Sequence, residues 1–244
     1  MITREMSMCR ALLVHLQLLP LFPRFNMKLG FGEMTVEEVC SHHGVQPEFF
    51  LEIANAYLDD SYVPGEGISR IPLGTVVNYL TSTHNYYLET ALPEVEHNIH
   101  RLLELSDLST KEARLVKDFF NDYKKEFMEH LSEEEQHVLP YILELEKQSR
   151  QDRPDPEFLK RLQDYSIREF EKGHDRLEIS LENLSRLIIK YLPPCNDFRL
   201  CQQVLNQLSV LVKDLVDHAE MEDKVLIPRV AELEQTMLDT YTRG

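Results

Sequence analysis

Apolar residues recur at spacings of three and four positions along most of the chain, from about residue 74 to residue 240. This periodicity places apolar side chains on one face of a helix and predicts amphipathic α-helices. Beyond Gly74 only one internal glycine, Gly173, interrupts the pattern. Prolines and polar runs, among them SRQDRPDP and YLPPCND, divide the region into four helical segments. These segments are residues 74–105, 109–149, 154–191 and 197–240.

Four long helices joined by short loops predict an all-α fold, an antiparallel four-helix bundle that occupies residues 74–244. The second helix has a defined start, because Ser109 and Glu112 stand three positions apart, as the two residues of a capping box do.

The first 73 residues follow a different pattern. They hold five of the eight glycines and five of the twelve prolines, so their elements must be short. Thr35 followed by Glu38 predicts a capped helix at TVEEVCSHHG, and Pro47 predicts the start of another at PEFFLEIANAYL. The stretch DDSYVPGEGISRIP is typical of a linker. We therefore predict a small helical N-terminal module, residues 1–73 including the linker, packed near the bundle or tethered to it.

Two segments of the bundle region carry the same pattern of polar and apolar residues. HLSEEEQHVLPYILELE begins at His130, and HAEMEDKVLIPRVAELE begins at His218, 88 residues later. They are identical at six of seventeen positions, where composition alone would give about one. In both, a glutamate follows the histidine by four positions and a proline follows it by ten. The agreement indicates an internal duplication of a helix pair.

The duplication also predicts a histidine upstream in each half. His84 lies 46 residues before His130, and His174 lies 44 residues before His218. Residues i and i+4 lie on one helical face, so each His-x-x-x-Glu pair directs an imidazole and a carboxylate to a common point. If the two halves face each other in the core, four imidazoles and two carboxylates converge between the helices.

Such a set of side chains suits two adjacent metal ions. The imidazoles would be terminal ligands, and the two carboxylates would bridge the ions and offset their charge. Iron, or manganese, suits imidazole with carboxylate, whereas zinc prefers fewer ligands and often thiolates. The residues therefore predict a di-iron core. The candidate ligands are His84, His130, Glu134, His174, His218 and Glu222.

The same residues resemble those of a known family. HLSEEEQHVLP and HAEMEDKVLIP resemble the paired ligand helices of hemerythrin-like bundles, in particular those of the repair-of-iron-centres (RIC) di-iron proteins. THNYYLETALPEV resembles the first-helix histidine region of that family, and EKGHDRLEISL its third-helix histidine region. The resemblance covers residues 74–240. MKLGFGEMTVEEVCSHHGVQPEFF is also similar to the small domain that precedes many RIC bundles, with LGFG where the family has paired cysteines before two glycines.

The resemblance implies that the six candidates are the ligands of an oxo- or hydroxo-bridged di-iron centre, with Glu134 and Glu222 as the bridges. RIC proteins are implicated in restoring iron–sulfur clusters damaged by nitric oxide or oxidants, by supplying iron. The resemblance therefore implies a non-haem iron protein that acts in iron–sulfur repair or in protection against nitrosative and oxidative stress. Damaged iron–sulfur proteins would be its partners, and a classical enzyme is not expected.

Other functions fit the same residues. Some hemerythrin-like domains bind dioxygen or nitric oxide reversibly, so a gas-binding or sensing module is one alternative. A ferritin-like di-iron oxidase is another, because Glu134/His137 and Glu171/His174 have the Glu-x-x-His spacing of such proteins. The duplicated segments preserve His-x-x-x-Glu and not Glu-x-x-His, which favours the histidine-rich site. A metal-free bundle with these residues on solvated faces is the last alternative.

The other histidines and aromatic residues of the bundle are predicted to be structural. His137 lies two turns beyond the first histidine of its segment, but its counterpart in the second copy is Val225. His97 and His100 lie off the helical face of His84. Aromatic side chains near the ligand faces are expected to pack in the core around the imidazoles. They are Tyr86, Tyr87, Tyr123, Phe127 and Tyr141.

Charge and cysteine content narrow the environment and the partners. The formal net charge is −16 and there is no run of Lys and Arg, so a phosphate backbone would be repelled and nucleic acid is not expected as a partner. The cysteines form no C-x-x-C pair, which is typical of reduced thiols in a cytoplasmic protein. Residues 11–22, ALLVHLQLLPLF, are too short to span a bilayer and lack a small-residue cleavage site, so neither a membrane span nor a signal peptide is predicted. The cysteines are Cys9, Cys40, Cys195 and Cys201.

Overall fold

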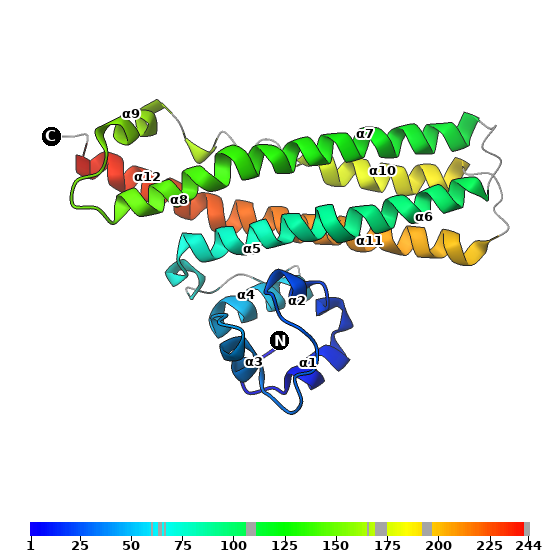
Figure 1. Cartoon of the computed structure of the whole chain (residues 1–244), viewed down its shortest axis with the longest axis horizontal. Helices are drawn as coiled ribbons and strands as arrows, with labels where there is room; N and C mark the ends of the chain where they lie inside the picture. Colours follow the sequence, from blue (N-terminus) through cyan, green and yellow to red (C-terminus); the bar gives the residue numbers. More distant parts are fainter. Residues whose placement is uncertain are drawn as a thin grey trace.

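The computed structural model confirms the predicted all-α bundle (Figure 1). It describes residues 1–59, 61–62, 65, 67–105, 111–164, 166–168, 175–191 and 197–241. Within these ranges the chain is helical and contains no strand, and one isolated bridge joins Ser7 to Thr35. No helix in the same ranges combines the length and the apolar character needed to cross a membrane.

The bundle runs along the longest axis of the molecule. Its first segment contains α5 (Leu73–Tyr86) and α6 (Leu92–Glu104), and its second contains α7 (Lys111–Glu133) and α8 (Leu139–Ser149). Its third contains α9 (Pro156–Asp164) and α10 (Asp175–Tyr191), and its fourth contains α11 (Phe198–Met221) and α12 (Ile227–Tyr241). The predicted cap at Ser109 lies outside the described residues.

The prediction of one continuous third helix was wrong. Helix α9 ends at Asp164, and the next described residues are not α-helical. The backbone N–H of Ile167 donates to the buried carboxylate of Glu234 in α12 at 3.1 Å, and Tyr141 donates to the same carboxylate at 2.7 Å. A side chain from another helix thus satisfies a backbone donor that a continuous helix would have bonded internally.

Three prolines explain why the other segments contain two helices each. Five-residue π-helical turns, Tyr87–Ala91, Glu134–Val138 and Glu222–Leu226, join their helices end to end. Each turn ends two residues before a proline: Pro93, Pro140 or Pro228. Within an α-helix the proline ring would clash with the carbonyl four residues earlier, and a wider turn relieves that clash. The N–H of Leu139 accordingly donates to the carbonyl of Glu134, five residues back.

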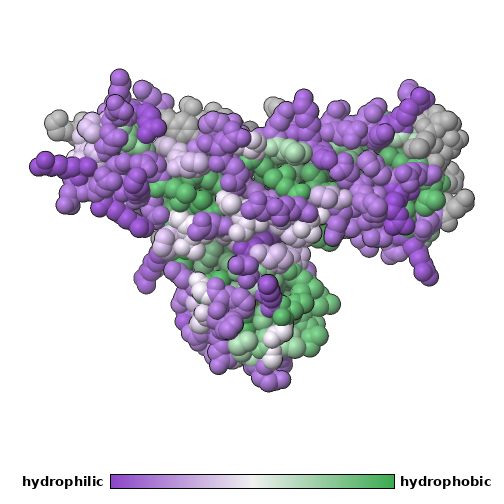
Figure 2. Space-filling view, in the orientation of Figure 1, coloured by the Kyte–Doolittle hydropathy of each residue, from purple (hydrophilic) through white to green (hydrophobic). Residues whose placement is uncertain are grey.

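The N-terminal module contains short helices and packs on the bundle against α5. They are α1 (Met8–Val14), α2 (Leu21–Arg24), α3 (Val36–His42) and α4 (Pro47–Leu58), with 3-10 turns at Leu16–Leu18 and Ile68–Arg70. The predicted capping box is present, since the Thr35 hydroxyl accepts from the Glu38 N–H at 3.2 Å and the Glu38 carboxylate accepts from the Thr35 N–H at 2.8 Å. Leu13 and Leu29 are 73% and 67% exposed, and Figure 2 shows hydrophobic surface over the side of the module where α1 lies.

Two hydrophobic clusters fill the interior, and a polar layer separates them inside the bundle. The first cluster joins the module to the end of the bundle that contains α8, α9 and α12. The second fills the end that contains α6, α7 and α10. Leu80 belongs to the first cluster and Tyr87 to the second, while Leu131 belongs to the second and Val138 to the first. The candidate ligands His84 and Glu134 lie between those residues.

Candidate metal centre

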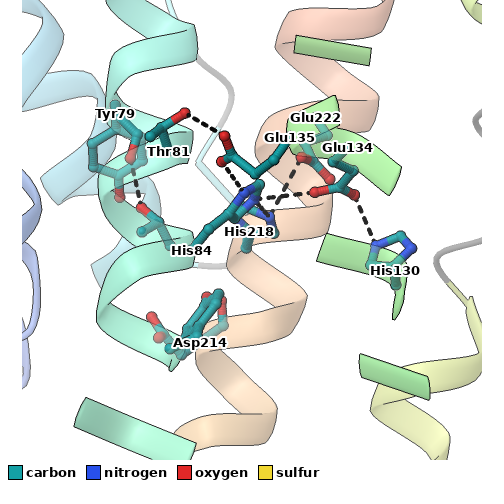
Figure 3. Close-up of polar contacts among 11 residues, drawn as sticks. Tyr79, Thr81, His84, His130, Glu134, Glu135, Asp214, His218 and Glu222 are labelled. Carbon is teal, nitrogen blue, oxygen red and sulfur yellow. Dashed lines mark hydrogen bonds and ion pairs between the residues drawn. The ribbon is translucent and has the colours of Figure 1, made fainter. Parts of the chain in front are cut away.

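Four of the six candidate ligands meet in the polar layer (Figure 3). His84 lies in the last turn of α5 and His218 in the last turn of α11, while Glu134 and Glu222 are each the first residue of a π-helical turn. One ligand atom from each residue lies within 4.8 Å of the other three. Their exposed fractions are between 0% and 8%, so the cluster is shielded from bulk solvent.

The contacts within the cluster show how closely its polar atoms approach. The Nε2 atoms of His84 and His218 lie 3.2 Å apart, and His84 Nε2 lies 3.1 Å from Glu134 Oε2. His218 Nε2 lies 3.4 Å from Glu222 Oε1. Two imidazole nitrogens and two carboxylates therefore face one small volume, and this mixed donor set suits a transition-metal cation.

His130 approaches the cluster from the other side of Glu134. Its Nε2 lies 2.8 Å from Glu134 Oε1, whereas His84 contacts Oε2 of the same carboxylate. His130 is not one of the four mutually close residues, and Figure 3 shows it beyond Glu134 as seen from His84. The two oxygens of one carboxylate thus serve histidines from different helices.

The remaining histidine predictions have mixed outcomes. His174 lies outside the described residues, as does Glu171 of the oxidase alternative. The side chain of His137 is 63% exposed and pairs with Glu133 at 3.3 Å, so it does not join the cluster. His97 and His100 are exposed on α6. The Glu134/His137 pairing that a ferritin-like oxidase needs is therefore not formed.

The sequence did not predict a role for Glu135, which contacts His84 on the side of the ring that faces away from the cluster. Its Oε1 lies 2.7 Å from Nδ1 of His84, the ring nitrogen that faces away from the cluster, and Thr81 donates to Oε2 at 3.3 Å. A carboxylate on the second nitrogen fixes the ring orientation and makes the other nitrogen a better ligand. The duplication contained a signal for this role, because a second acidic residue, Asp223, follows Glu222 as Glu135 follows Glu134.

The surrounding charges set the protonation state of His84 when no cation is bound. Burial opposes the charged imidazolium, but hydrogen bonds to Glu134 and Glu135 outweigh burial and raise the pKa of His84 to about 9. The hydrogen bond from His84 in turn lowers the pKa of Glu135. A proton on His84 therefore offsets part of the negative charge that a cation would otherwise neutralise.

Aromatic side chains border the candidate metal centre on the side that faces the second hydrophobic cluster. The ring of Tyr87 packs edge-on against His218 with centroids 5.7 Å apart, and it also contacts Phe127 at 5.7 Å. Tyr123 stacks on Phe127 at 5.8 Å. Tyr141 instead lies in the first turn of α8, where it stacks on Phe158. Predicted aromatic packing around the imidazoles is therefore observed for Tyr87, which limits the movement of His218.

The family model described as hemerythrin HHE cation-binding domain matches residues 88–230, more than half of the chain. The chain belongs to the hemerythrin family. The hemerythrin match includes the segments that begin at His130 and His218, but it starts four residues after His84. His84 is therefore placed by the geometry of the cluster rather than by the match. No curated protein matches the chain.

The donor set fits the cation that a hemerythrin domain binds. Two fully buried glutamates next to each other would be strongly destabilising unless positive charge compensated them. A cation between Glu134, Glu222 and the two facing imidazoles supplies that charge and gives each Nε2 an acceptor for its lone pair. The arrangement could therefore hold a metal ion.

Proposed function

We propose that this hemerythrin-family domain binds two iron ions in its polar layer and acts as a non-haem iron protein that takes up and supplies iron. His84 and His218 would hold one ion, and His130 and His174 the other. Glu134 and Glu222 would bridge them. Iron bound there would supply redox and ligand-exchange chemistry.

The observation that carries the proposal of two ions is the two-sided use of Glu134. Its two oxygens contact imidazoles of different helices, at 3.1 Å for His84 and 2.8 Å for His130. A single ion held by the four close residues would not involve His130. A bridging carboxylate needs one oxygen for each ion, and this arrangement supplies both.

The residues of the chain also explain how iron would be held. Each carboxylate offsets part of the charge of the ions, while Glu135 accepts from His84 Nδ1 and keeps Nε2 directed at the cluster. Burial of the four close residues limits the access of solvent to a bound ion. The ligands can exchange protons for metal, because a protonated His84 must deprotonate before it binds.

The physiological role that we propose is repair of iron–sulfur centres or protection against nitrosative and oxidative stress. Support comes from the resemblance of both ligand segments and of the N-terminal module to RIC proteins. Imidazole and carboxylate ligands would suit iron(II) without thiolates. Damaged iron–sulfur proteins would be the acceptors.

Iron content per chain after anaerobic reconstitution tests the two-ion site. We expect about two irons in the wild type, about one in His84→Gln or His130→Gln, and less than one in Glu134→Gln. The matched control is His137→Gln, an exposed histidine in the same π-helical turn as Glu134, which should keep the wild-type content. Two irons retained in His130→Gln, or one iron in the wild type, would contradict the bridging role of Glu134.

Transfer of iron to an iron-depleted cluster protein tests the role. The loaded protein would be mixed with an apo ferredoxin, sulfide and a thiol, and cluster absorption would be followed. Cluster assembly faster than with the same concentration of free iron(II) is expected. Assembly no faster than from free iron would contradict a role in supply.

A cavity next to His218 favours gas binding as a second candidate function. It lies between the module and the bundle and has a volume of about 50 Å³, and its lining includes Tyr57, Tyr79 and His218 together with charged residues such as Arg24 and Lys224. This volume admits a molecule of diatomic size. Titration of the iron-loaded protein with nitric oxide, followed by its visible spectrum, tests this function. Full spectral recovery after removal of the gas would support carriage or sensing, and irreversible loss of iron would oppose it.

A further inference from the structure

Arg24 of the N-terminal module is buried where the module meets α5 and α11, next to the candidate metal centre. It ends helix α2, and its side chain is only 2% exposed. Its guanidinium pairs with the carboxylate of Asp214 in α11, which is 3% exposed. The same guanidinium lies 5.0 Å and 5.5 Å from the ring centroids of Tyr86 and Tyr87. The module thus contributes a buried charge to its junction with the bundle.

Two contacts connect this ion pair to the ligand His218. Asp214 precedes His218 by one helical turn, so both side chains lie on the same face of α11. The hydroxyl of Tyr87 donates to the carbonyl of Asp214 at 3.1 Å, and the Tyr87 ring packs against the His218 imidazole. Arg24 therefore holds both the residue one turn before the ligand and the ring that packs against the ligand.

The ion pair is better suited to fixing geometry than to stabilising the fold. A buried Arg–Asp pair gains little net free energy, because the desolvation of both charges offsets their attraction. It does require one relative position of α2 and α11, since either charge alone would be buried without a partner. The cavity that Arg24 and His218 both line lies at this junction.

We propose that Arg24 is a positioning residue of the metal centre: through Asp214 and Tyr87 it fixes His218, so that docking of the N-terminal module controls how firmly the ion on the His84–His218 side is retained. This inference rests on the proposed function, because it needs a bound ion. It gives the module a role in iron retention, because a residue of the module holds the surroundings of one ligand in place.

The test follows release of iron from full-length, iron(II)-loaded protein to an excess of a colorimetric chelator under anaerobic conditions. Arg24→Met is expected to release one of the two ions at least tenfold faster than the wild type. Because this variant leaves the Asp214 carboxylate buried without its partner, the double variant Arg24→Met/Asp214→Leu is measured as well. Arg4→Met is the matched control, because Arg4 pairs with Glu48 inside the module and is 41% exposed.

The double variant separates positioning from folding. The double variant has no unpaired buried carboxylate, so its melting temperature should return toward the wild-type value. The fast release of one ion should persist. The visible spectrum of the cobalt(II)-loaded double variant should also differ from that of the wild type, since it reports ligand geometry. Wild-type release rates and a wild-type cobalt spectrum in the double variant would overturn the inference. Absence of metal in the wild type would instead refute the proposed function.

Discussion

Stability of the metal-free protein should depend strongly on pH through His84. The pKa of His84 is about 9 in the folded chain, compared with 6.5 for an unperturbed histidine. The side chain is 1% exposed, so solvent screens its contacts little. A raised pKa means that the folded state binds the proton more tightly than the unfolded state. The resulting stabilisation is complete below pH 6.5 and is lost as the pH rises through 9.

The size of this effect follows from the shift in pKa. Each pKa unit corresponds to about 1.4 kcal/mol, so the shift of His84 contributes about 3 kcal/mol of unfolding free energy at low pH. Metal binding should show the opposite dependence, because a proton on His84 competes with the cation. Between pH 7 and 9 the apparent affinity for the ion at His84 should rise about tenfold per pH unit.

Urea unfolding of chelator-treated protein at several pH values between 6 and 9.5, at constant ionic strength, measures the effect. His84→Gln provides the reference, since glutamine does not titrate. The wild type should lose about 3 kcal/mol more than His84→Gln across this range. Parallel curves for the two proteins would show that the imidazole is not held protonated by Glu134 and Glu135, and the electrostatic reasoning would fail.

Three further predictions concern the support of the site. Glu135→Gln should weaken metal binding by about ten- to a hundredfold in a chelator competition, because His84 loses the carboxylate that orients it. The control Glu133→Gln, on the surface, should bind metal as the wild type does. Pro140→Ala removes the clash that favours the π-turn at Glu134. This variant should retain metal less well than the wild type, while the melting temperature of the metal-free protein is not lowered. Unchanged metal retention would show that the turn does not depend on the proline. Removal of metal from the wild type should lower the calorimetric melting temperature, because the ion binds only the folded chain; an unchanged value would argue against a buried ion.

The sequence was most informative where physical constraints are local. Periodicity predicted the bundle, and the Thr35 capping box was predicted residue for residue. The duplicated His-x-x-x-Glu segments predicted that Glu134, His218 and Glu222 converge, because an i,i+4 spacing fixes a shared helical face, whereas His130 lies beyond Glu134. The approach of His84 to His218 also followed from placing the two halves face to face.

Other features depend on contacts between distant segments and could not be predicted. The break after α9 requires Glu234 from α12, 67 residues beyond Ile167. The Arg24–Asp214 pair spans 190 residues, and neither residue belongs to a motif. An acidic residue follows Glu134 and Glu222 in both segments, and this repeat was a signal for Glu135. An acidic run on a helix is usually solvated, however, so only the three-dimensional structure distinguishes Glu135 from its acidic neighbours.

The separation of the two hydrophobic clusters has a consequence for cooperativity. In most small domains one continuous core makes unfolding an all-or-none event. Here the polar layer around Glu134 and Glu222 divides the bundle crosswise, and without a cation its members contribute little attraction between the two ends. The metal-free chain should therefore contain two units that open separately in hydrogen exchange, one of them including the N-terminal module. A bound ion, with ligands from several helices, would join them into one cooperative unit, so iron loading would determine whether the molecule unfolds in one step or two.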